Sequence, residues 1–498
     1  MSDADTNPPP TQSDRTARLA GPTRAGPIAL DEAVAAIRSG PQGPQVAAVF
    51  DFGGTVVHGF TPVRRVLRRR RLADSLLTSI RGARGEGEYE RFLQRAMHEW
   101  AGHTEAELTE LGEALFRKAV YGHLYPEAWR LIRAHEAAGH TLMLATCLTR
   151  FQVLPVATEL GIEHVLYTPM VARDGVLSGH VDGKPLWRNG KADAVRRFAA
   201  ARDIDLARSH GYADAFPDLP LLELVGHPTA VNPDPRLAMA AGDRPWPVLT
   251  FRPRRAPGPR DIARTAAGFA SLLGGAAYGV AAESRTRERR RMADSMITHA
   301  AAATLATTGV RLRVTGAGHA RAPRPAVYLF NHQSQFDMVV LAAVLGAGFT
   351  GIVKKEVTAN PIFGPLLRFA GATFIDRSDT ASAKAALAPV IDTLRGGLSL
   401  VVAPEGTRSR TPRVGPFKKG AFHIAIQAGV PVVPIVIRNA GEIAWRDSAV
   451  VRKGTVDVAV LPPIDVSDWA PENLDADVER VRRMFIETLL DWPAPEQD

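Results

Sequence analysis

A proline- and arginine-rich stretch divides this chain into halves of similar size. Residues 252–260 read RPRRAPGPR and follow the strand-like segment WPVLTF. Proline and glycine interrupt helices and strands, so such a stretch is typical of a linker between domains. A chain of 498 residues is also too long for one hydrophobic core. We predict a disordered tail at 1–27, a first domain at 28–251, a linker at 252–261, helices at 262–308 and a second domain at 309–490.

The composition favours anionic partners and a reducing compartment. The net charge is +9, which attracts nucleic acid, phosphorylated small molecules or an anionic membrane face. The sequence has no aromatic-rich or recognition-helix motif, so we expect no nucleic acid among the partners. The single cysteine, Cys147, excludes a disulfide framework and a cysteine metal cluster. The near absence of cysteine suits a reducing cytoplasm. Residues 1–27 are rich in Pro, Thr and Arg and lack the apolar stretch of a secretory signal, so we expect a disordered tail there.

One apolar stretch near the middle of the chain is short for a membrane span. Residues 265–282 read TAAGFASLLGGAAYGVAA, and these 18 residues are at the lower limit for crossing a bilayer. Most of them are Ala or Gly, and an arginine-rich segment follows at 285–291. We predict peripheral or weakly inserted association with the anionic cytoplasmic face of a membrane. The alternative is a helix packed in the protein, with the arginines exposed to solvent. The arginine run at 64–71 can likewise be a solvated surface.

Apolar, strand-like runs alternate with helical segments in both halves. The first half has such runs at 46–50, 141–145 and 229–231, and a charged, helix-patterned insert at about 60–125. This alternation predicts a parallel sheet covered by helices on both faces, an α/β fold. The second half begins with helical segments and then alternates again. Its predicted strands lie at 311–315, 326–330, 351–354, 373–376, 398–403, 432–437 and 456–461, and its helices at 334–345, 380–394 and 417–428.

Four elements of the first half carry residue types used in phosphate chemistry. They are Asp51 in VFDFGGTVV, Thr146 after LMLA, Lys191 in RNGKADAV, and Asp214 and Asp218 in YADAFPDLP. Ligands of parallel sheets bind at the carboxyl ends of strands, where Asp51 and Thr146 stand. In this order and spacing, the motifs resemble the haloacid dehalogenase superfamily of aspartate-nucleophile phosphatases, in the branch similar to phosphoserine phosphatases. The resemblance covers about residues 45–250 and implies a Rossmann-like domain whose insert at 60–125 is a helical cap.

The resemblance also implies a role for each residue. Asp51 is the expected nucleophile and Mg²⁺ ligand, Thr146 and Lys191 hold the phosphoryl group, and Asp214 is the other metal carboxylate, with Asp218 in support. The family carries a second acid two positions after the nucleophile, where this chain has Gly53. The Gly53 carbonyl can still ligate Mg²⁺, but glycine cannot transfer protons, and that loss costs on the order of 10²–10⁴ in rate. We expect a domain that binds Mg²⁺ and phosphate with impaired turnover; slow phosphatase activity is the alternative.

A second set of motifs lies in the other half. NHQSQFD places Asn331, His332 and Asp337 between a strand and an apolar helix. GATFIDR, PEGTRS and VPVVPI follow in order. Together these blocks are similar to the glycerophospholipid acyltransferase family, notably the 1-acylglycerol-3-phosphate acyltransferases, over about residues 300–465. The resemblance implies an α/β acyltransferase domain preceded by helices.

The residue types in these blocks fit acyl transfer to a hydroxyl group. His332 suits the general base, and Asp337 suits the carboxylate that orients it and stabilises the imidazolium. The spacing of Ser334 and Asp337 also fits a helix capping box, and one aspartate can serve both purposes. No enzyme nucleophile is implied, so we expect the acyl group to pass directly to the acceptor.

The remaining blocks suit a phosphorylated acceptor. The guanidinium group of arginine can form two parallel hydrogen bonds with a phosphate. Arg377 and Arg408 are therefore the expected phosphate ligands. The resemblance adds Glu405, expected to position an arginine or the acceptor hydroxyl, together with Gly406, Thr407, Lys354 and the neighbouring Lys355.

These inferences converge on a membrane-associated acyltransferase fused to a phosphatase-like domain. It is expected to move a fatty acyl group from acyl-coenzyme A or acyl carrier protein to lysophosphatidic acid, giving phosphatidic acid, with no cofactor required for the transfer. One alternative is acylation of glycerol 3-phosphate or another lysophospholipid. The other takes phosphatase activity of the first domain as primary, although Gly53 argues against it.

Overall fold

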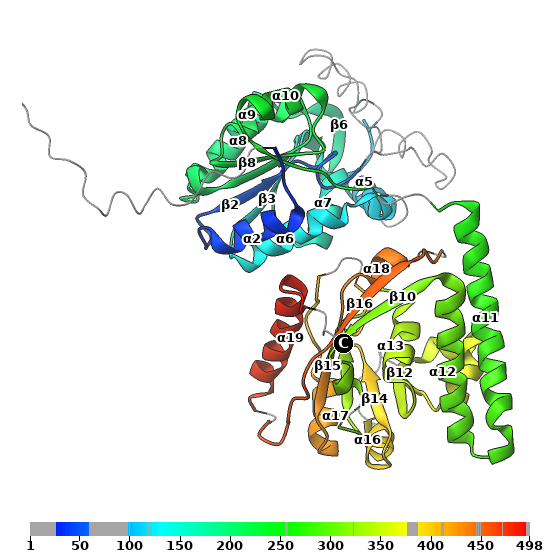
Figure 1. Cartoon of the computed structure of the whole chain (residues 1–498). Coiled ribbons are helices and arrows are strands. Elements are labelled where there is room, and N and C mark those ends of the chain that lie inside the picture. The colour runs from blue at the N-terminus through cyan, green and yellow to red at the C-terminus, as the bar shows by residue number, and fades with distance from the viewer. Residues whose placement is uncertain are drawn as a thin grey trace, which may run out of the picture. The chain divides into compact units, whose positions relative to one another are not determined.

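A computed structural model of the chain divides into two compact units, residues 1–254 and 255–498 (Figure 1). The structure describes residues 26–58, 98, 100–116, 120–253, 257–321, 323–375, 387–409, 413–444, 446, 448, 450–470 and 472–494. The predicted tail up to residue 25, the arginine run at 64–71 and most of the predicted cap at 60–125 lie outside the described residues. Gly26 and Pro27, placed in the tail by the sequence, form a short strand instead.

The first unit is built on a seven-stranded parallel sheet. Its strand order is β1-β9-β8-β7-β2-β3-β4, and every pairing in it is parallel. All four residues of β2 are buried, as expected for a parallel strand covered on both faces. The strands are β1 (Gly26–Pro27), β2 (Ala47–Phe50), β3 (Thr141–Ala145), β4 (His164–Leu166), β7 (His210–Ala213), β8 (His227–Val231) and β9 (Pro247–Leu249).

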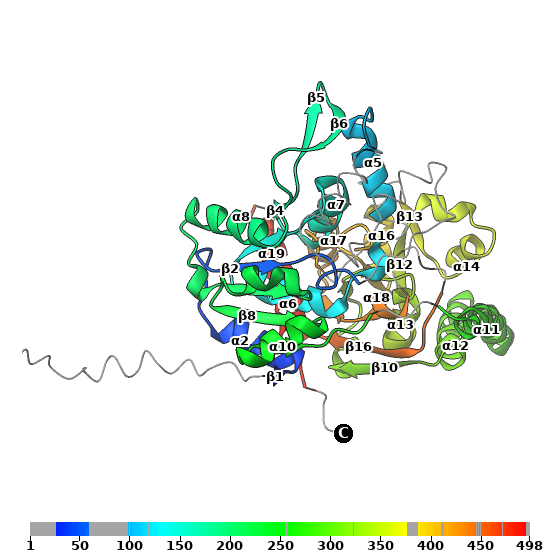
Figure 2. The ribbon, with the colours of Figure 1, turned by 90° about the horizontal axis from the view of Figure 1, so that it is seen from above.

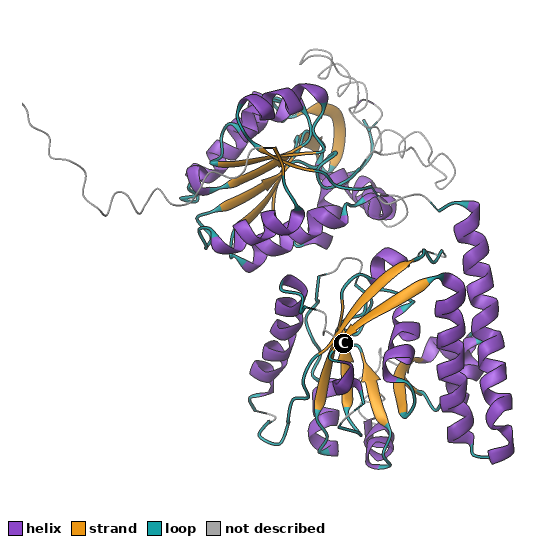
Figure 3. Ribbon diagram, in the orientation of Figure 1, coloured by secondary structure: helices purple, strands orange, loops and turns teal. Residues whose placement is uncertain are grey.

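Helices cover both faces of this sheet, as the alternation predicted. Figure 1 shows α2, α6 and α7 on one face and α8, α9 and α10 on the other, and Figure 3 shows the same layers by type. These helices are α2 (Leu30–Ser39), α6 (Pro126–Ala137), α7 (Arg150–Leu160), α8 (Asn189–Ala200), α9 (Leu219–Leu222) and α10 (Pro235–Asp243), with short 3₁₀ turns η2 (Tyr121–His123), η3 (Leu206–Arg208) and η4 (Phe216–Asp218).

A hairpin and a helix extend from one side of the first unit (Figure 2). The antiparallel strands β5 (Met170–Arg173) and β6 (Val176–Val181) form the hairpin, which the sequence did not predict. Helix α5 (Glu105–Leu115) begins beside it, because the backbone N–H of Glu105 donates to the Gly175 carbonyl at 2.9 Å. Thr104 and Glu107 close a capping box at the start of α5. This is the part of the predicted cap that the structure describes.

The second unit begins with a long helical hairpin. Helix α11 (Pro259–Glu283) continues through the 3₁₀ turn η5 (Ser284–Thr286), and α12 (Arg289–Thr308) runs back along it. Glycines of α11 make close packing possible: a Cβ at Gly275 would lie 2.6 Å from the His299 carbonyl oxygen, and one at Gly279 would lie 2.4 Å from that of Ser295. The small residues of the apolar stretch are therefore needed for helix packing.

The second unit is also built on a seven-stranded sheet, which is mixed. Its order is β10-β16-β15-β11-β14-β12-β13, and the β15–β16 pair alone is antiparallel. The strands are β10 (Val310–Thr315), β11 (Val327–Phe330), β12 (Phe349–Lys354), β13 (Thr373–Ile375), β14 (Ser399–Val402), β15 (Val432–Ile437) and β16 (Gly454–Val460). The expectation of α/β architecture is confirmed in both units.

Alternate residues of the central strand β11 enter two hydrophobic cores. Tyr328 and Phe330 pack with Val340 of α13 on one face, and Val327 and Leu329 pack in the core on the other face. The remaining helical elements of the second unit are α13 (Asp337–Leu345), α14 (Phe363–Phe369), α16 (Leu387–Arg395), α17 (Gly420–Ala428), α18 (Ala440–Ile443) and α19 (Leu474–Leu490), with 3₁₀ turns η6 (Ala317–Ala320) and η7 (Lys355–Ala359).

Candidate functional site

A histidine–aspartate pair stands at the carboxyl end of the central strand of the second unit. β11 ends at Phe330, and α13 begins at Asp337. Nδ1 of His332 and Oδ2 of Asp337 are 2.8 Å apart. The carboxylate can only accept, so it holds the hydrogen on Nδ1 and leaves Nε2 with its lone pair. Asp337 is fully buried, whereas His332 is partly exposed. The pair thus presents one basic nitrogen towards the outside.

The loop before α13 is folded around the Asp337 carboxylate. Besides His332, its Oδ2 accepts hydrogen bonds from the backbone N–H groups of Gln333 and Ser334, both at 2.8 Å. The Ser334 hydroxyl accepts from the Phe336 N–H and donates to the Ala444 carbonyl. The predicted capping box is therefore only half made, because the Ser334 side chain does not bond to Asp337. The turn uses residues 334–336, which moves the helix start from the predicted Ser334 to Asp337.

Glu405 holds the backbone of His332. It follows β14, the parallel neighbour of β11, and its Oε1 accepts from the His332 N–H at 3.1 Å. Its Oε2 accepts from the Ser409 hydroxyl at 3.0 Å and the Gly415 N–H at 3.3 Å. The Ser409 N–H in turn donates to the His332 carbonyl at 2.7 Å. Burial raises the pKa of Glu405. The sequence analysis assigned Glu405 to an arginine or the acceptor hydroxyl; in the structure its carboxylate holds the His332 backbone.

Asn331 links the end of β11 to β15, its neighbour on the other side. Its side-chain amide donates to the Ile437 carbonyl at 2.8 Å, and its side-chain oxygen accepts from the Ile437 N–H at 2.7 Å. Both partners are buried, so loss of the pair leaves polar groups unsatisfied. The residue before His332 is thereby fixed to β15.

The residues predicted to bind phosphate are only partly described. Gly406 has φ +75°, and a Cβ there would lie 3.0 Å from the Lys418 side chain, so this lysine approaches the backbone of the predicted phosphate loop. Arg408 is partly exposed, and the Arg446 guanidinium donates to its carbonyl at 2.6 Å. Arg377 and the side chain of Lys354 lie outside the described residues, although β12 places the Lys354 backbone at the same edge.

A second cluster of charged groups stands at the carboxyl edge of the first unit's sheet. Asp51 follows β2, and Lys191 lies in the first turn of α8. The Lys191 ammonium is 2.6 Å from Oδ1 of Asp51 and 2.5 Å from Oδ1 of Asp218. Burial alone would lower the pKa of Lys191, but the Asp218 and Asp51 carboxylates outweigh it and raise that pKa. The lysine is charged and bonded to both acids.

Three carboxylates of this cluster crowd together. Oxygens of Asp51, Asp214 and Asp218 all lie within 4.8 Å of one another. Burial, followed by the Asp51 and Asp218 charges, raises the pKa of Asp214. Asp51 and Asp218 are buried and Asp214 is partly buried. One ammonium group does not balance three clustered carboxylates, and a hard divalent cation such as Mg²⁺ takes oxygen ligands of this kind. The donor set fits such an ion.

Two adjacent glycines next to Asp51 have different surroundings. Gly54 has φ +80°, and a Cβ there would lie 1.8 Å from Oδ2 of Asp214. The chain passes too close to the acidic cluster at this point for any side chain. Among the residues that the structure describes, none lies within 4 Å of a Cβ added at Gly53. The position where related phosphatases carry an acid has room for one.

The comparisons with known proteins divide the chain in the same way. Residues 48–223 match the family model described as haloacid dehalogenase-like hydrolase, and residues 311–438 match the model described as Acyltransferase. The chain is a fusion of a haloacid dehalogenase-like unit and an acyltransferase unit. Both resemblances drawn from the motifs are confirmed.

The relatives of the acyltransferase unit share one name. A 1-acyl-sn-glycerol-3-phosphate acyltransferase of Limnanthes douglasii is 34% identical over 183 residues, which is 36% of this chain and 64% of the relative. The human 1-acyl-sn-glycerol-3-phosphate acyltransferase alpha is 35% identical over 179 residues, 36% of this chain and 63% of the relative. The chain thus spans less than two thirds of the length of these curated relatives.

A solved structure also overlaps this chain. The lysophosphatidate acyltransferase PlsC of Thermotoga maritima is 23% identical, and the match covers 46% of this chain and 97% of that one with a TM-score of 0.39. That TM-score is too low to support a shared fold by itself.

The structure brings most of the predicted residues together. In the acyltransferase unit it pairs His332 with Asp337 and adds Glu405 behind them. In the haloacid dehalogenase-like unit it gathers Asp51, Lys191, Asp214 and Asp218, with Thr146 buried at the end of the neighbouring strand β3. Sequence reasoning missed the roles of Ser409 and Lys418. Ser409 could have been noticed, since it ends the PEGTRS block, but no signal marked Lys418.

We expect Gly54→Ala to destabilise the haloacid dehalogenase-like unit and Gly53→Ala to leave it nearly unchanged. A side chain at Gly54 meets the Asp214 carboxylate and requires an unfavourable positive φ, which together cost about 1–3 kcal/mol of unfolding free energy. Urea unfolding of both variants, followed by a signal from the first unit, measures the difference. A similar loss of stability in the two variants would contradict this account of the turn.

Proposed function

We propose that the acyltransferase unit transfers a fatty acyl group from a thioester to lysophosphatidic acid, giving phosphatidic acid. The observation that carries this proposal is the 2.8 Å contact between His332 Nδ1 and Asp337 Oδ2 at the carboxyl edge of the sheet. The names of its relatives support this acceptor and this reaction. Acylation of glycerol 3-phosphate or another lysophospholipid is the alternative within the same chemistry.

The pair acts on the acceptor hydroxyl. Nε2 of His332 takes the proton as the hydroxyl oxygen attacks the thioester carbonyl, and Asp337 stabilises the imidazolium that forms. When the tetrahedral intermediate collapses, the carbon–sulfur bond breaks and the imidazolium returns the proton to the departing thiolate. The new carbon–oxygen bond is the ester of the product. Glu405 keeps the His332 backbone in place throughout. The donor is acyl-coenzyme A or acyl carrier protein, and the transfer requires no cofactor.

The acceptor phosphate is assigned to the loops beside the base. Arg377 and Arg408 provide fork donors, and Gly406 and Thr407 provide backbone close to them. Lys354 adds charge at the same edge, and Lys418 approaches Gly406. On this proposal the phosphate lies next to the end of β14, the strand that pairs in parallel with β11 before His332.

We propose that α11 brings this unit to an anionic membrane surface. Among the described residues, one helix, residues 259–286, is long and apolar enough to cross a membrane by length and composition. The side chains of Ile262, Phe269 and Tyr278 are exposed on α11. Phe269 contacts the ring of Phe363, itself exposed at the start of α14, so the apolar surface continues onto the second element.

The arginines that follow α11 contribute less free charge than the sequence suggested. Arg289 donates to the carbonyls of Arg368 and Phe369, at the end of α14. Arg290 pairs with Asp294 and also donates to the Phe349 carbonyl. These two side chains hold α12 against neighbouring segments. Arg291 pairs with Glu288 at 2.8 Å. Arg285 and Arg287 are proposed to contact lipid headgroups, and apolar contact supplies the rest of the membrane affinity.

For the haloacid dehalogenase-like unit we propose Mg²⁺ and phosphate binding with impaired hydrolysis. Asp51, Asp214 and the Gly53 carbonyl would hold the ion, and Thr146 and Lys191 would hold the phosphoryl group. The bound ion would offset the negative charge of the phosphoryl oxygens. Gly53 offers no proton to a leaving group, which is the reason for slow turnover. A primary phosphatase activity on a phosphomonoester is the alternative for this unit.

We expect His332→Ala to abolish acyl transfer and Asp337→Asn to remove most of it. The first change removes the base, and the second favours the wrong tautomer of the imidazole. Purified full-length protein, labelled acyl-coenzyme A and lysophosphatidic acid give the rates, and circular dichroism checks the fold. The matched control is His319→Ala, which lies after β10 at the opposite edge of the sheet and should keep normal activity. Near-normal rates in folded His332→Ala protein would exclude the mechanism.

We expect Arg377→Ala and Arg408→Ala to weaken the use of phosphorylated acceptors selectively. Loss of a charge-assisted phosphate contact costs on the order of 2–5 kcal/mol. The measurement compares kcat/KM on lysophosphatidic acid with that on a monoacylglycerol of the same chain. Arg311→Ala, on the exposed edge strand β10, is the control. If both arginine variants lose the same factor on the two acceptors, the phosphate assignment is wrong.

We expect the protein to bind anionic vesicles reversibly through α11. High salt or carbonate washing should release a good part of it, and the double substitution Phe269→Ser and Tyr278→Ser should weaken binding because it removes exposed apolar side chains. Met239→Ser, at an exposed apolar position on α10, is the matched control. Vesicle sedimentation gives the bound fraction. Retention after carbonate washing, as for an integral protein, would show that α11 spans the bilayer.

We expect Gly53→Asp to raise phosphatase turnover above a slow wild-type rate. The added carboxyl group supplies the missing general acid and base, and the space around Gly53 accepts it. Steady-state phosphate release from an alkyl phosphate, with Mg²⁺ present, measures the gain, and adding Asp51→Asn should abolish it. Brisk hydrolysis by the wild type that Asp51→Asn removes would show that another group supplies the proton.

A further inference from the structure

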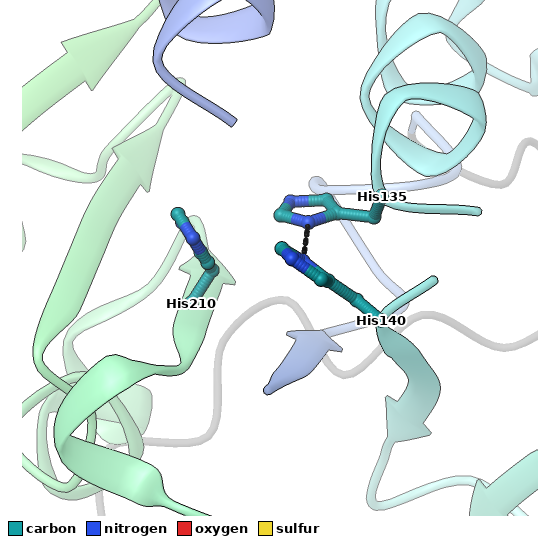
Figure 4. A group of neighbouring side chains, drawn as sticks. All are labelled: His135, His140 and His210. Atoms are coloured by element: carbon teal, nitrogen blue, oxygen red, sulfur yellow. Dashed lines mark hydrogen bonds between the residues drawn. The ribbon is translucent and has the colours of Figure 1, made fainter. Parts of the chain in front are cut away.

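Three buried histidines gather at the amino-terminal edge of the sheet in the haloacid dehalogenase-like unit (Figure 4). His135 lies in the last turn of α6, His140 immediately precedes β3, and His210 is the first residue of β7. The acidic cluster stands at the other end of the same strands, since Thr146 immediately follows β3 and Asp214 immediately follows β7. The strands separate the two groups by roughly 15 Å.

We propose that His135, His140 and His210 form a binding site for a zinc-type transition metal ion. One ring nitrogen from each lies within 4.8 Å of the other two. Zinc binds imidazole nitrogens at about 2.0–2.1 Å, so tetrahedral ligand atoms lie roughly 3.3 Å apart. To reach that spacing the side chains must move. The ring of His210, which stacks on that of His140 with 23° between the planes, must also rotate to direct a nitrogen at the ion. A purely imidazole donor set suits zinc and its neighbours, whereas Mg²⁺ prefers the carboxylates at the opposite edge.

The hydrogen bonds around the cluster follow a fixed order. Nε2 of His140 lies 2.8 Å from the Pro41 carbonyl, which can only accept, so this nitrogen carries the hydrogen. In the neutral ring Nδ1 of His140 then accepts from Nδ1 of His135, 2.8 Å away. Nε2 of His135 in turn accepts from the Tyr212 hydroxyl at 2.9 Å. Nδ1 of His140 therefore already has its lone pair directed into the cluster.

These outer bonds also suit metal ligands. Histidines that bind metals usually bond their other ring nitrogen to a carbonyl or another polar group, which fixes the tautomer. Pro41 does this for His140. His135 becomes a ligand when its hydrogen moves from Nδ1 to Nε2, where the Tyr212 oxygen accepts it. No net gain or loss of a proton is required for that change of tautomer.

His210 supplies a further reason to expect a ligand. Its ring faces the other two in Figure 4, and its centroid is 4.7 Å from that of His135. Within the described part of the chain, Nε2 of His210 is buried and has no hydrogen-bond partner. An unsatisfied buried nitrogen costs about 1–3 kcal/mol, and a metal ion would satisfy it. Burial lowers the pKa of all three histidines, so they are neutral as metal binding needs.

The test is a zinc titration of the full-length protein after removal of metal with a chelator. Excess Mg²⁺ is kept present so that the acidic cluster is occupied. Isothermal calorimetry should show one zinc ion per chain, and Co²⁺ should give the visible absorption of a nitrogen-ligated site. Zinc should also raise the melting temperature of the first unit, because it binds the folded state. Absence of stoichiometric binding would overturn the proposal and leave the cluster as a hydrogen-bonded relay.

Variants locate the ion. His140→Gln and His210→Gln should weaken zinc binding at least 100-fold, while His164→Gln, a change on β4 in the same unit, should leave it unchanged. Tyr212→Phe keeps all three ligands and should weaken binding about 10–100-fold through the outer bond. The wild-type Co²⁺ spectrum needs no variant, so a misfolded His210→Gln does not remove the test. Zinc binding that survives both glutamine variants, or is lost in Asp214→Asn instead, would overturn the assignment.

Discussion

Both candidate sites depend on one geometric constraint, that neighbouring parallel strands end at the same edge of a sheet. β11 and β14 pair in parallel, so His332 and Glu405 meet although 73 residues separate them. β2 and β7 also pair in parallel, which brings Asp51 close to Asp214. Hydrogen bonds then refine these positions. In the acyltransferase unit a single buried carboxylate, Asp337, receives the ring nitrogen and two backbone N–H groups, so loop shape and tautomer are fixed together.

The two units use buried charge in different ways. Oδ2 of Asp337 accepts from three hydrogen-bond donors, and the His332 side chain above it is partly exposed. The carboxylates around Lys191 share one cation, which already bonds to Asp51 and Asp218 and does not balance all three charges. A divalent ion that relieved this crowding would also draw in phosphate. Gly53 has no side chain to transfer a proton. We therefore propose binding with slow turnover for the first unit and acyl transfer for the second.

The sequence predicted the parts that apolar periodicity and motifs control. β3 and β15 were placed with their observed bounds, and the residues of both sites were identified by motif. Prediction from sequence failed where contacts between distant segments determine whether a strand or a side-chain contact forms. β7, with the sequence HGYA, has too little apolar character to be recognised alone, and β2 and β8 on either side make it a strand. Glu405 accepts from backbone groups of His332 and Gly415, and Arg289 donates to the carbonyls of Arg368 and Phe369. No local sequence pattern reveals these contacts between distant segments.

Helix α11 shows why composition alone left two interpretations open. Its glycines allow α12 to approach, since added side chains at Gly275 and Gly279 would meet the α12 backbone. Its larger apolar residues, including Phe269 and Tyr278, are exposed on the surface. Packing therefore explains the small residues but not the large ones. Water does not favour that exposed apolar surface, which an adjoining membrane would cover. Packing against α12 accounts for the glycines of α11, and the proposed contact with a membrane surface would account for its exposed Phe269 and Tyr278.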